Sequence, residues 1–166
     1  MYKSIESAYQ GVYAFSWLAG HCQYEMQMKH EYCDPSWIAP WDKYINNILS
    51  QSLTIHGIWP SNPTTSNFGK FNIKIFQDNL KLLDDMNNYW PPKTKASTTN
   101  VFLWEHEWDT HGHDYAANIF ALRPDEFAGT TEQRNQRLQL AFFQEAVNFY
   151  KKFNVKKIGK NILTKG

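Results

Sequence analysis

The sequence has little cysteine and no long apolar segment. Only two of its 166 residues are cysteines, Cys22 and Cys33. They are too few for a four-cysteine zinc site, and their spacing suits either one local disulfide or two reduced thiols. No segment approaches the roughly 20 apolar residues of a membrane-spanning helix. The N-terminus also lacks the ~7–15-residue apolar stretch of a signal peptide, so a secretory protein with this sequence would be a mature or a recombinant form.

An excess of one charge is missing as well. The net charge is only +1, which excludes a protein that coats polyanions through a broad basic surface. A nucleic-acid function would therefore depend on a local cleft. Aromatic residues make up 16% of the chain, and they can fill a β-rich core or stack on bases. The length predicts one domain, residues 1–166, that is long enough to bury a core.

The segment 104–114, Trp-Glu-His-Glu-Trp-Asp-Thr-His-Gly-His-Asp, is the richest in ionisable groups. It holds three of the six histidines of the chain, four carboxylates and two tryptophans, Trp104 and Trp108. On a helix, Glu107 and His111 are four residues apart and share a face. A carboxylate beside an imidazole can set its orientation and its pKa, as proton-transfer catalysis requires.

Three interpretations of this segment compete. A solvated helix face would explain the charges but not the interleaved tryptophans. A zinc protease helix needs the spacing His-Glu-x-x-His. Here one more residue separates His106 from His111, so the two imidazoles would diverge by about 140° at α-helical pitch. The third interpretation is metal-free acid–base chemistry by His111 and Glu107, completed by a second histidine from elsewhere.

The segment 53–60, Leu-Thr-Ile-His-Gly-Ile-Trp-Pro, contains a candidate for that second histidine. Alternation of apolar and polar residues predicts a strand with His56 on its polar face. Gly57 and Pro60 are expected to break the strand, which leaves His56 near its end and Trp59 just beyond.

Together, His-Gly-Ile-Trp-Pro at 56–60 and Trp-Glu-His-Glu-Trp-x-x-His-Gly at 104–112 resemble the two active-site segments of the ribonuclease T2 family, the secretory acid ribonucleases. The resemblance covers roughly residues 12–155. It implies an α+β fold, with a central antiparallel sheet flanked by amphipathic helices over 73–89 and 136–153. It also implies a metal-independent endoribonuclease that needs no cofactor and acts in a secretory, lysosomal or vacuolar compartment.

Catalytic residues follow from the matching motif positions. His111 resembles the general base of the family and His56 its general acid. Glu107 matches the carboxylate near the scissile phosphate, and His106 matches an auxiliary histidine that contacts the phosphate. Two imidazoles near their usual pKa can divide the acid and base roles below neutral pH, which predicts a bell-shaped pH dependence.

The resemblance further implies single-stranded RNA as the substrate, with Trp59 and Leu103 as substrate-binding residues. Trp59 matches an aromatic residue that stacks on a base; a core tryptophan is the structural alternative. The expected products are a 2′,3′-cyclic phosphate and then a 3′-phosphate. A disulfide between Cys22 and Cys33 is also implied, since the family has one in this part of its chain.

The chain departs from the family pattern at three places. Thr110 stands where the family usually has a lysine, which predicts a slow enzyme. The positions of a second family disulfide, near residues 91–93 and at His113-Asp114, hold no cysteine, and His113 and Asp114 are expected in a solvated loop. The chain also stops before the family's C-terminal strands, so a protein partner or a complementing C-terminal fragment is expected. These departures favour a rival interpretation, an inactive subunit with a structural or assembly role.

Patterns elsewhere predict further elements. Tyr13, Phe15 and Trp17 should share one face of a strand, and the spacing of Phe76, Leu80, Leu83 and Trp90 indicates one amphipathic helix. The expected ranges are a strand over 12–17, helices over 42–49, 73–89 and 136–153, a turn-rich loop over 61–69, and loop or short helix from 112 to about 131.

Overall fold

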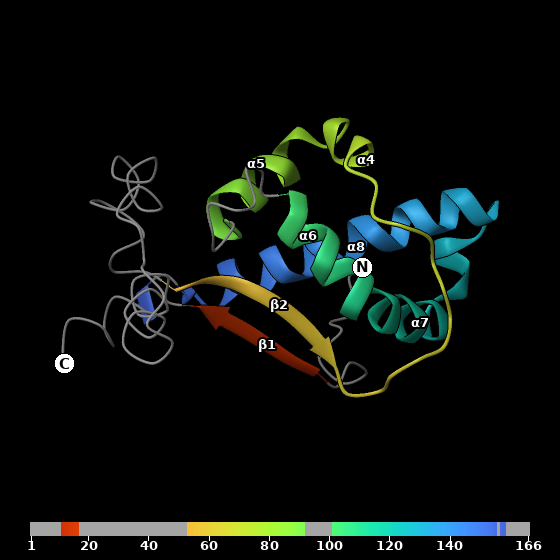
Figure 1. Cartoon of the computed structure of the whole chain (residues 1–166), viewed down its shortest axis with the longest axis horizontal. Helices are drawn as coiled ribbons and strands as arrows, with labels where there is room; N and C mark the ends of the chain where they lie inside the picture. Colours follow the sequence, from red (N-terminus) through yellow and green to blue (C-terminus); the bar gives the residue numbers. More distant parts are fainter. Residues whose placement is uncertain (1–10, 17–52, 92–100, 156, 159–166) are drawn as a thin grey trace, which may run out of the picture.

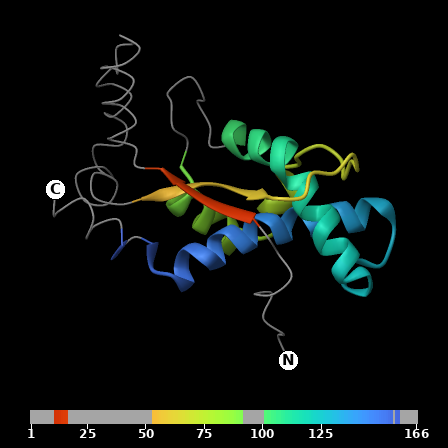
Figure 2. The ribbon, with the colours of Figure 1, turned by 90° about the horizontal axis from the view of Figure 1, so that it is seen from below.

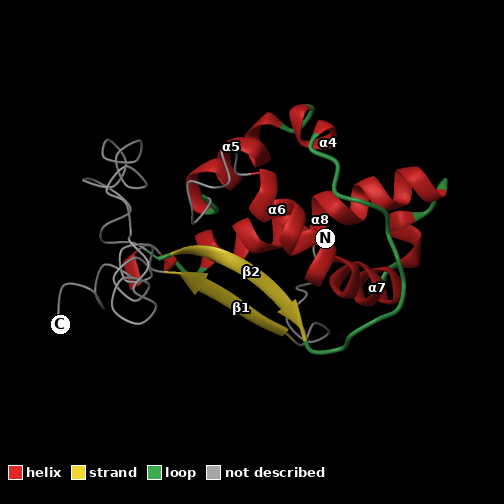
Figure 3. Ribbon diagram, viewed as in Figure 1, coloured by secondary structure: helices red, strands yellow, loops and turns green. Residues whose placement is uncertain are grey.

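The computed structural model describes residues 11–16, 53–91, 101–155 and 157–158 (Figure 1). Among these residues the fold is α+β, with an antiparallel pair of strands and a set of helices (Figure 3). The predicted α+β class, with an antiparallel sheet, is therefore confirmed. Cys22, Cys33, Trp17 and the helix expected over 42–49 lie outside the described residues.

Strands β1 (Gly11–Ser16) and β2 (Thr54–Pro60) form the sheet. The predicted strand over 12–17 is confirmed in its described part, and its aromatic face packs on the long helix α8 (Thr131–Lys152). Tyr13 stacks on Phe149 with ring centroids 3.6 Å apart, and its hydroxyl donates a hydrogen bond to Glu145. Figure 2 shows the two strands between α8 and α6 (Val101–Glu107).

The end of β2 differs from the prediction. Gly57 does not break the strand, which continues to Pro60 with Gly57 opposite Ala14. The predicted polar face is covered at Thr54, which is buried like Ile55. A register shift between Ala14 and Phe15 also interrupts the regular pairing of the strands, and it is described below with the site.

The helix predicted over 73–89 is two helices, α4 (Lys74–Gln77) and α5 (Leu80–Tyr89). The interruption at residues 78–79 changes the phase of the buried face. Leu82 and Met86 are therefore buried, whereas Leu80, which the uninterrupted spacing placed on the apolar face, is 71% exposed. The helix ends one residue before the buried Trp90 and two before Pro91.

Past Gly112 the structure is more helical than expected. A π-helical turn, η4 (Trp108–Gly112), continues α6 and leads directly into α7 (His113–Leu122). Of the loop or short helix expected from 112 to about 131, the structure has the helix over this part, and α7 buries an apolar face made by Tyr115, Ala116 and Ile119. A short 3-10 helix, η5 (Pro124–Phe127), follows.

Helix α8 starts five residues earlier than the apolar pattern indicated. A capping box explains the early start, because the Thr130 side chain accepts a hydrogen bond from Gln133 N and the Gln133 side chain accepts one from Thr130 N. Two backbone donors at the helix start are thereby satisfied.

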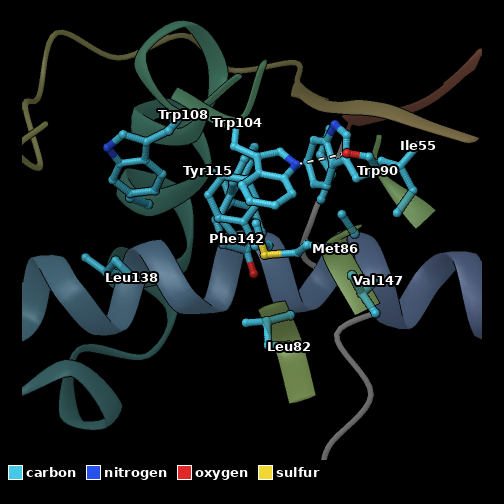
Figure 4. Close-up of a cluster of buried hydrophobic side chains, with 14 of the residues drawn as sticks. Ile55, Leu82, Met86, Trp90, Trp104, Trp108, Tyr115, Leu138, Phe142 and Val147 are labelled. Atoms are coloured by element: carbon cyan, nitrogen blue, oxygen red, sulfur yellow. Dashed lines mark hydrogen bonds between the residues drawn. The ribbon is translucent and has the colours of Figure 1, made fainter. Parts of the chain in front are cut away.

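The core lies between α8, the helices around it and one face of β2 (Figure 4). Trp90, Trp104 and Trp108 are almost completely buried. The indole N–H of Trp104 donates to the backbone oxygen of Trp90 at 3.0 Å, so this tryptophan buries no unpaired donor. Within the part of the chain that the structure describes, no helix is both long and apolar enough to cross a membrane.

Phe142 is completely buried and its ring contacts those of Trp90, Trp108 and Tyr115. We expect Phe142→Ala to lower the free energy of unfolding by about 3–5 kcal/mol, because the cavity adds to the lost transfer energy. Phe102→Ala is the matched control, since Phe102 is 67% exposed and should cost under about 0.5 kcal/mol. Urea unfolding monitored by circular dichroism measures both; equal losses would contradict this account of the core.

Candidate active site

Four side chains from two distant segments of the chain meet beside the end of β2. His56 and Trp59 come from β2, Glu107 from the end of α6, and His111 from η4. The Trp59 ring lies between the two imidazoles, with its centroid 5.2 Å from that of His56 and 5.6 Å from that of His111. The structure thus brings together the four residues that the two motifs single out, His56, Trp59, Glu107 and His111.

Glu107 joins the two segments. Its side chain is only 1% exposed, and its two carboxylate oxygens face different partners. His56 Nε2 lies 3.5 Å from Oε1, while the Trp59 indole N–H donates to Oε2 at 3.3 Å. A carboxylate in this position stabilises a protonated imidazole and fixes the orientation of both rings.

A β-bulge aims His56 at the carboxylate. Phe15 pairs with Ile55 and Ala14 pairs with Gly57, so His56 is the extra residue of β2 at the register shift. Bulges of this kind redirect a side chain and recur beside active sites. The other ring nitrogen, His56 Nδ1, lies 3.3 Å from the Ser16 hydroxyl. Sequence reasoning missed Ser16, because only the pairing of the strands brings it to His56.

Gly57 makes room for the buried carboxylate. A Cβ atom at this position would collide with Glu107 Oε2, and it would lie 2.9 Å from the indole nitrogen of Trp59. The sequence indicated only that Gly57 is a poor strand residue. Its role is a close approach of backbone and side chain, which is the other common reason for glycine in a strand.

The π-helical turn changes the relation between the histidines of the central segment. The predicted divergence of about 140° assumed α-helical pitch. The i→i+5 hydrogen bonding of η4 widens the turn, so residues five apart lie on nearer faces. His106 and His111 are five residues apart and flank the start of this turn. Burial lowers the pKa of His111 below its usual 6.5, the charge of His106 lowers it further, and Asp114 opposes both effects.

The remaining predicted residues lie along the same helical segment. His106 and Thr110 are exposed, and Leu103 is half-buried one turn before Glu107. Among the residues that the structure describes, no group of three or more His, Cys, Asp or Glu side chains is placed to hold a metal ion.

His113 and Asp114 do not lie in a solvated loop, and this prediction is wrong. They are the first residues of α7, and both accept hydrogen bonds from the loop over 61–69. Phe68 N donates to His113 Nδ1 at 3.2 Å, and Thr64 N donates to Asp114 Oδ1 at 2.7 Å. Burial lowers the pKa of His113, against the opposing charges of Asp109 and Asp114.

Several known ribonucleases are similar to this chain. A sequence model of the ribonuclease T2 family matches residues 12–162. Ribonuclease M of Aspergillus phoenicis is 32% identical over 122 residues, which cover 67% of this chain and 48% of the relative. Ribonuclease DdI of Dictyostelium discoideum is 31% identical over 112 residues, which cover 58% of this chain and 45% of the relative.

The chain thus spans about half the length of these relatives. A crystal structure of human RNase T2 superposes with a TM-score of 0.44 at 23% sequence identity, over 64% of this chain and 46% of the human one.

Gly57→Ala should destabilise the protein through its collision with Glu107. We expect a loss of more than about 1 kcal/mol in the free energy of unfolding, as for other overpacked sites. The matched control is the same substitution in a Glu107→Ala background, where the colliding carboxylate is absent. A double-mutant cycle should give a coupling energy of about 0.5–3 kcal/mol. Additive effects would contradict the assignment of Gly57 as the space for this carboxylate.

Proposed function

Because the chain belongs to the ribonuclease T2 family, we propose that it is an endoribonuclease that cleaves single-stranded RNA without a metal ion. One observation carries this proposal. The side chains of His56, Trp59, Glu107 and His111 converge from segments about 50 residues apart, with one indole between two imidazoles. Two imidazoles of different environment are what acid–base cleavage of RNA requires.

The reaction uses the ribose 2′-hydroxyl as the nucleophile. The 2′-oxygen forms a bond to the adjacent phosphorus, and the bond from phosphorus to the 5′-oxygen of the next nucleotide breaks. The base takes the proton of the 2′-hydroxyl, and the acid gives a proton to the leaving 5′-oxygen. The products are a 2′,3′-cyclic phosphate and a free 5′-hydroxyl. Water then opens the cyclic phosphate to a 3′-phosphate, with the two proton transfers reversed.

The environments of the two histidines support their different roles. His111 must be neutral to act as the base, and its pKa is lowered by burial and by His106. His56 must be protonated to act as the acid, and the buried carboxylate of Glu107 lies 3.5 Å from its Nε2. Charge on the phosphorane would be stabilised by the protonated His56 and by His106, which is exposed on the same helical segment.

Substrate binding is proposed for the residues that border these groups. Trp59 is half-buried, and its N–H is held by Glu107, so a fixed ring is available for stacking on a base beside both histidines. Leu103 lies one turn before Glu107 and would contact a neighbouring base. A secretory or vacuolar location, as in the family, stays a prediction.

The exposed Thr110 favours a second candidate function, a catalytically weak or inactive subunit with a role in assembly. The position beside His111 carries no charge here, and one lost electrostatic stabiliser costs on the order of 10²–10³-fold in rate. In this alternative the chain would bind a protein partner or a complementing fragment.

Cleavage in excess EDTA between about pH 4 and 8 tests the two-histidine mechanism. We expect cyclic-phosphate ends, and a loss of roughly 10²–10⁴-fold in kcat/KM for both His56→Ala and His111→Ala. Asn148→Ala is the matched control, because Asn148 lies on the exposed side of α8 and its replacement should leave kcat/KM near the wild-type value. Since the pKa of His111 is lowered, the rate should rise with pH through a value below 6.5 and fall again as His56 loses its proton. Wild-type protein that is folded but inactive in EDTA would contradict the proposal.

Thr110→Lys tests whether a missing cation limits the rate. We expect kcat to increase by roughly ten- to a hundredfold, because the lysine adds a positive charge next to His111 where the phosphorane forms. Thr110→Gln has similar length without the charge and should leave kcat near the wild-type value. A lysine variant no faster than the glutamine variant would show that the threonine does not limit this enzyme.

A further inference from the structure

The loop over 61–69 touches the π-helical turn at two neighbouring backbone groups. The N–H of Phe68 donates to His113 Nδ1 at 3.2 Å, and the carbonyl of Gly69 accepts from the Trp108 indole at 2.8 Å. Trp108 is the first residue of η4, and His113 immediately follows its last residue. Two consecutive residues of the loop therefore hold both ends of the turn that carries His111.

This double contact depends on the π-helical geometry. Trp108 and His113 are five residues apart, and at α-helical pitch their side chains would diverge by about 140°. In the structure their ring centroids lie 5.2 Å apart, with the planes at 62°. Both rings can reach the same short piece of loop only because the turn is widened. The two hydrogen bonds thus favour the π turn over a regular α-helical one.

The loop itself is fixed by further hydrogen bonds. Thr64 N is held by Asp114, and Gly69 N is held by the Asn67 side chain, with Gly69 in the left-handed region at φ +82°. Phe68 and Gly69 also border an open pocket of about 430 Å³, which Asn135 and Gln139 line as well. The Phe68 side chain is buried in the core and stacks on the His113 ring, so packing and hydrogen bonds together fix the position of the segment.

We propose that Trp108 and His113 are positioning residues that clamp the π-helical turn to the loop and thereby hold His111 in its place beside Trp59 and His106. His113 can accept the Phe68 N–H only while Nδ1 carries no proton, and Trp108 can donate only through its indole nitrogen. Gly112, between His111 and His113, lies directly against the Trp108 ring, and a Cβ atom there would collide with that ring.

The pKa of His111, measured by NMR titration of its imidazole, reports on this clamp without any substrate. Burial and the charges of His106 and Asp114 act on that pKa, and the His113→Asn variant, which also removes the imidazole, controls for a direct electrostatic effect of residue 113. We expect His113→Ala to raise the pKa of His111 toward 6.5, because a relaxed turn withdraws it from burial and from His106. His113→Asn keeps an acceptor near the position of Nδ1 and should leave the pKa close to the wild-type value.

Two further variants separate positioning from loss of stability. Trp108→Phe keeps an aromatic ring but removes the donor to Gly69, and it should shift the pKa of His111 in the same direction as His113→Ala. Val147→Ala removes part of a buried side chain of α8; it should destabilise the fold without moving that pKa. An unchanged pKa of His111 in both folded clamp variants would overturn the proposal, and so would an equal shift in Val147→Ala.

The kinetic part rests on the proposed ribonuclease function. On a dinucleotide substrate, His113→Ala should lower kcat by about ten- to a hundredfold with little change in KM, because a misplaced base affects chemistry more than binding. His113→Asn should restore most of the rate. A folded wild-type protein that cleaves no RNA would count against the ribonuclease function alone, since the NMR titration still decides whether the clamp exists.

Discussion

The buried carboxylate of Glu107 is the interaction on which the site depends. Its side chain is 1% exposed and has almost no contact with solvent. Its two oxygens are directed at His56 and Trp59, which belong to β2. A buried charge without partners would cost several kcal/mol. The Glu107 carboxylate therefore holds β2 against the end of α6 and also orients His56, the candidate acid. A substitution of Glu107 would change both the local stability and the geometry of the site.

Two irregularities of the backbone make this arrangement possible. The bulge in β2 turns His56 toward the carboxylate, and Gly57 leaves the space that the carboxylate occupies. On the other side, η4 interrupts the α-helical pitch and brings His111 toward Trp59 and His106. Both irregularities occur within the two motifs, whereas α8 and α5 are regular helices that supply the core. The protein thus combines a regular scaffold with a site whose residues depend on departures from regularity.

These departures also mark the limit of prediction from the sequence. The aromatic face of the first strand, the amphipathic α8 and the meeting of the two histidine motifs could be predicted, because each depends on residue types at regular spacing. The interruption at residues 78–79, the bulge at His56 and the π turn could not, since period-based reasoning assumes constant pitch and register. The exposure of Leu80 and the pKa of His111 both follow from such local changes of phase. His113 and Asp114 were misplaced for another reason: their partners are backbone groups of a distant loop, and no side-chain pattern reveals them.

The contact between Tyr13 and Glu145 has a consequence for the order of folding. These residues are 132 positions apart, and their hydrogen bond holds β1 on α8. Contacts of such separation form late, because closing a long loop costs entropy before any compensating packing is gained. The strand that creates the bulge at His56 can therefore dock only after α8 has been synthesised. During translation a nascent chain would contain both histidine motifs well before it contained an assembled site, so the site could form only after most of these residues had left the ribosome.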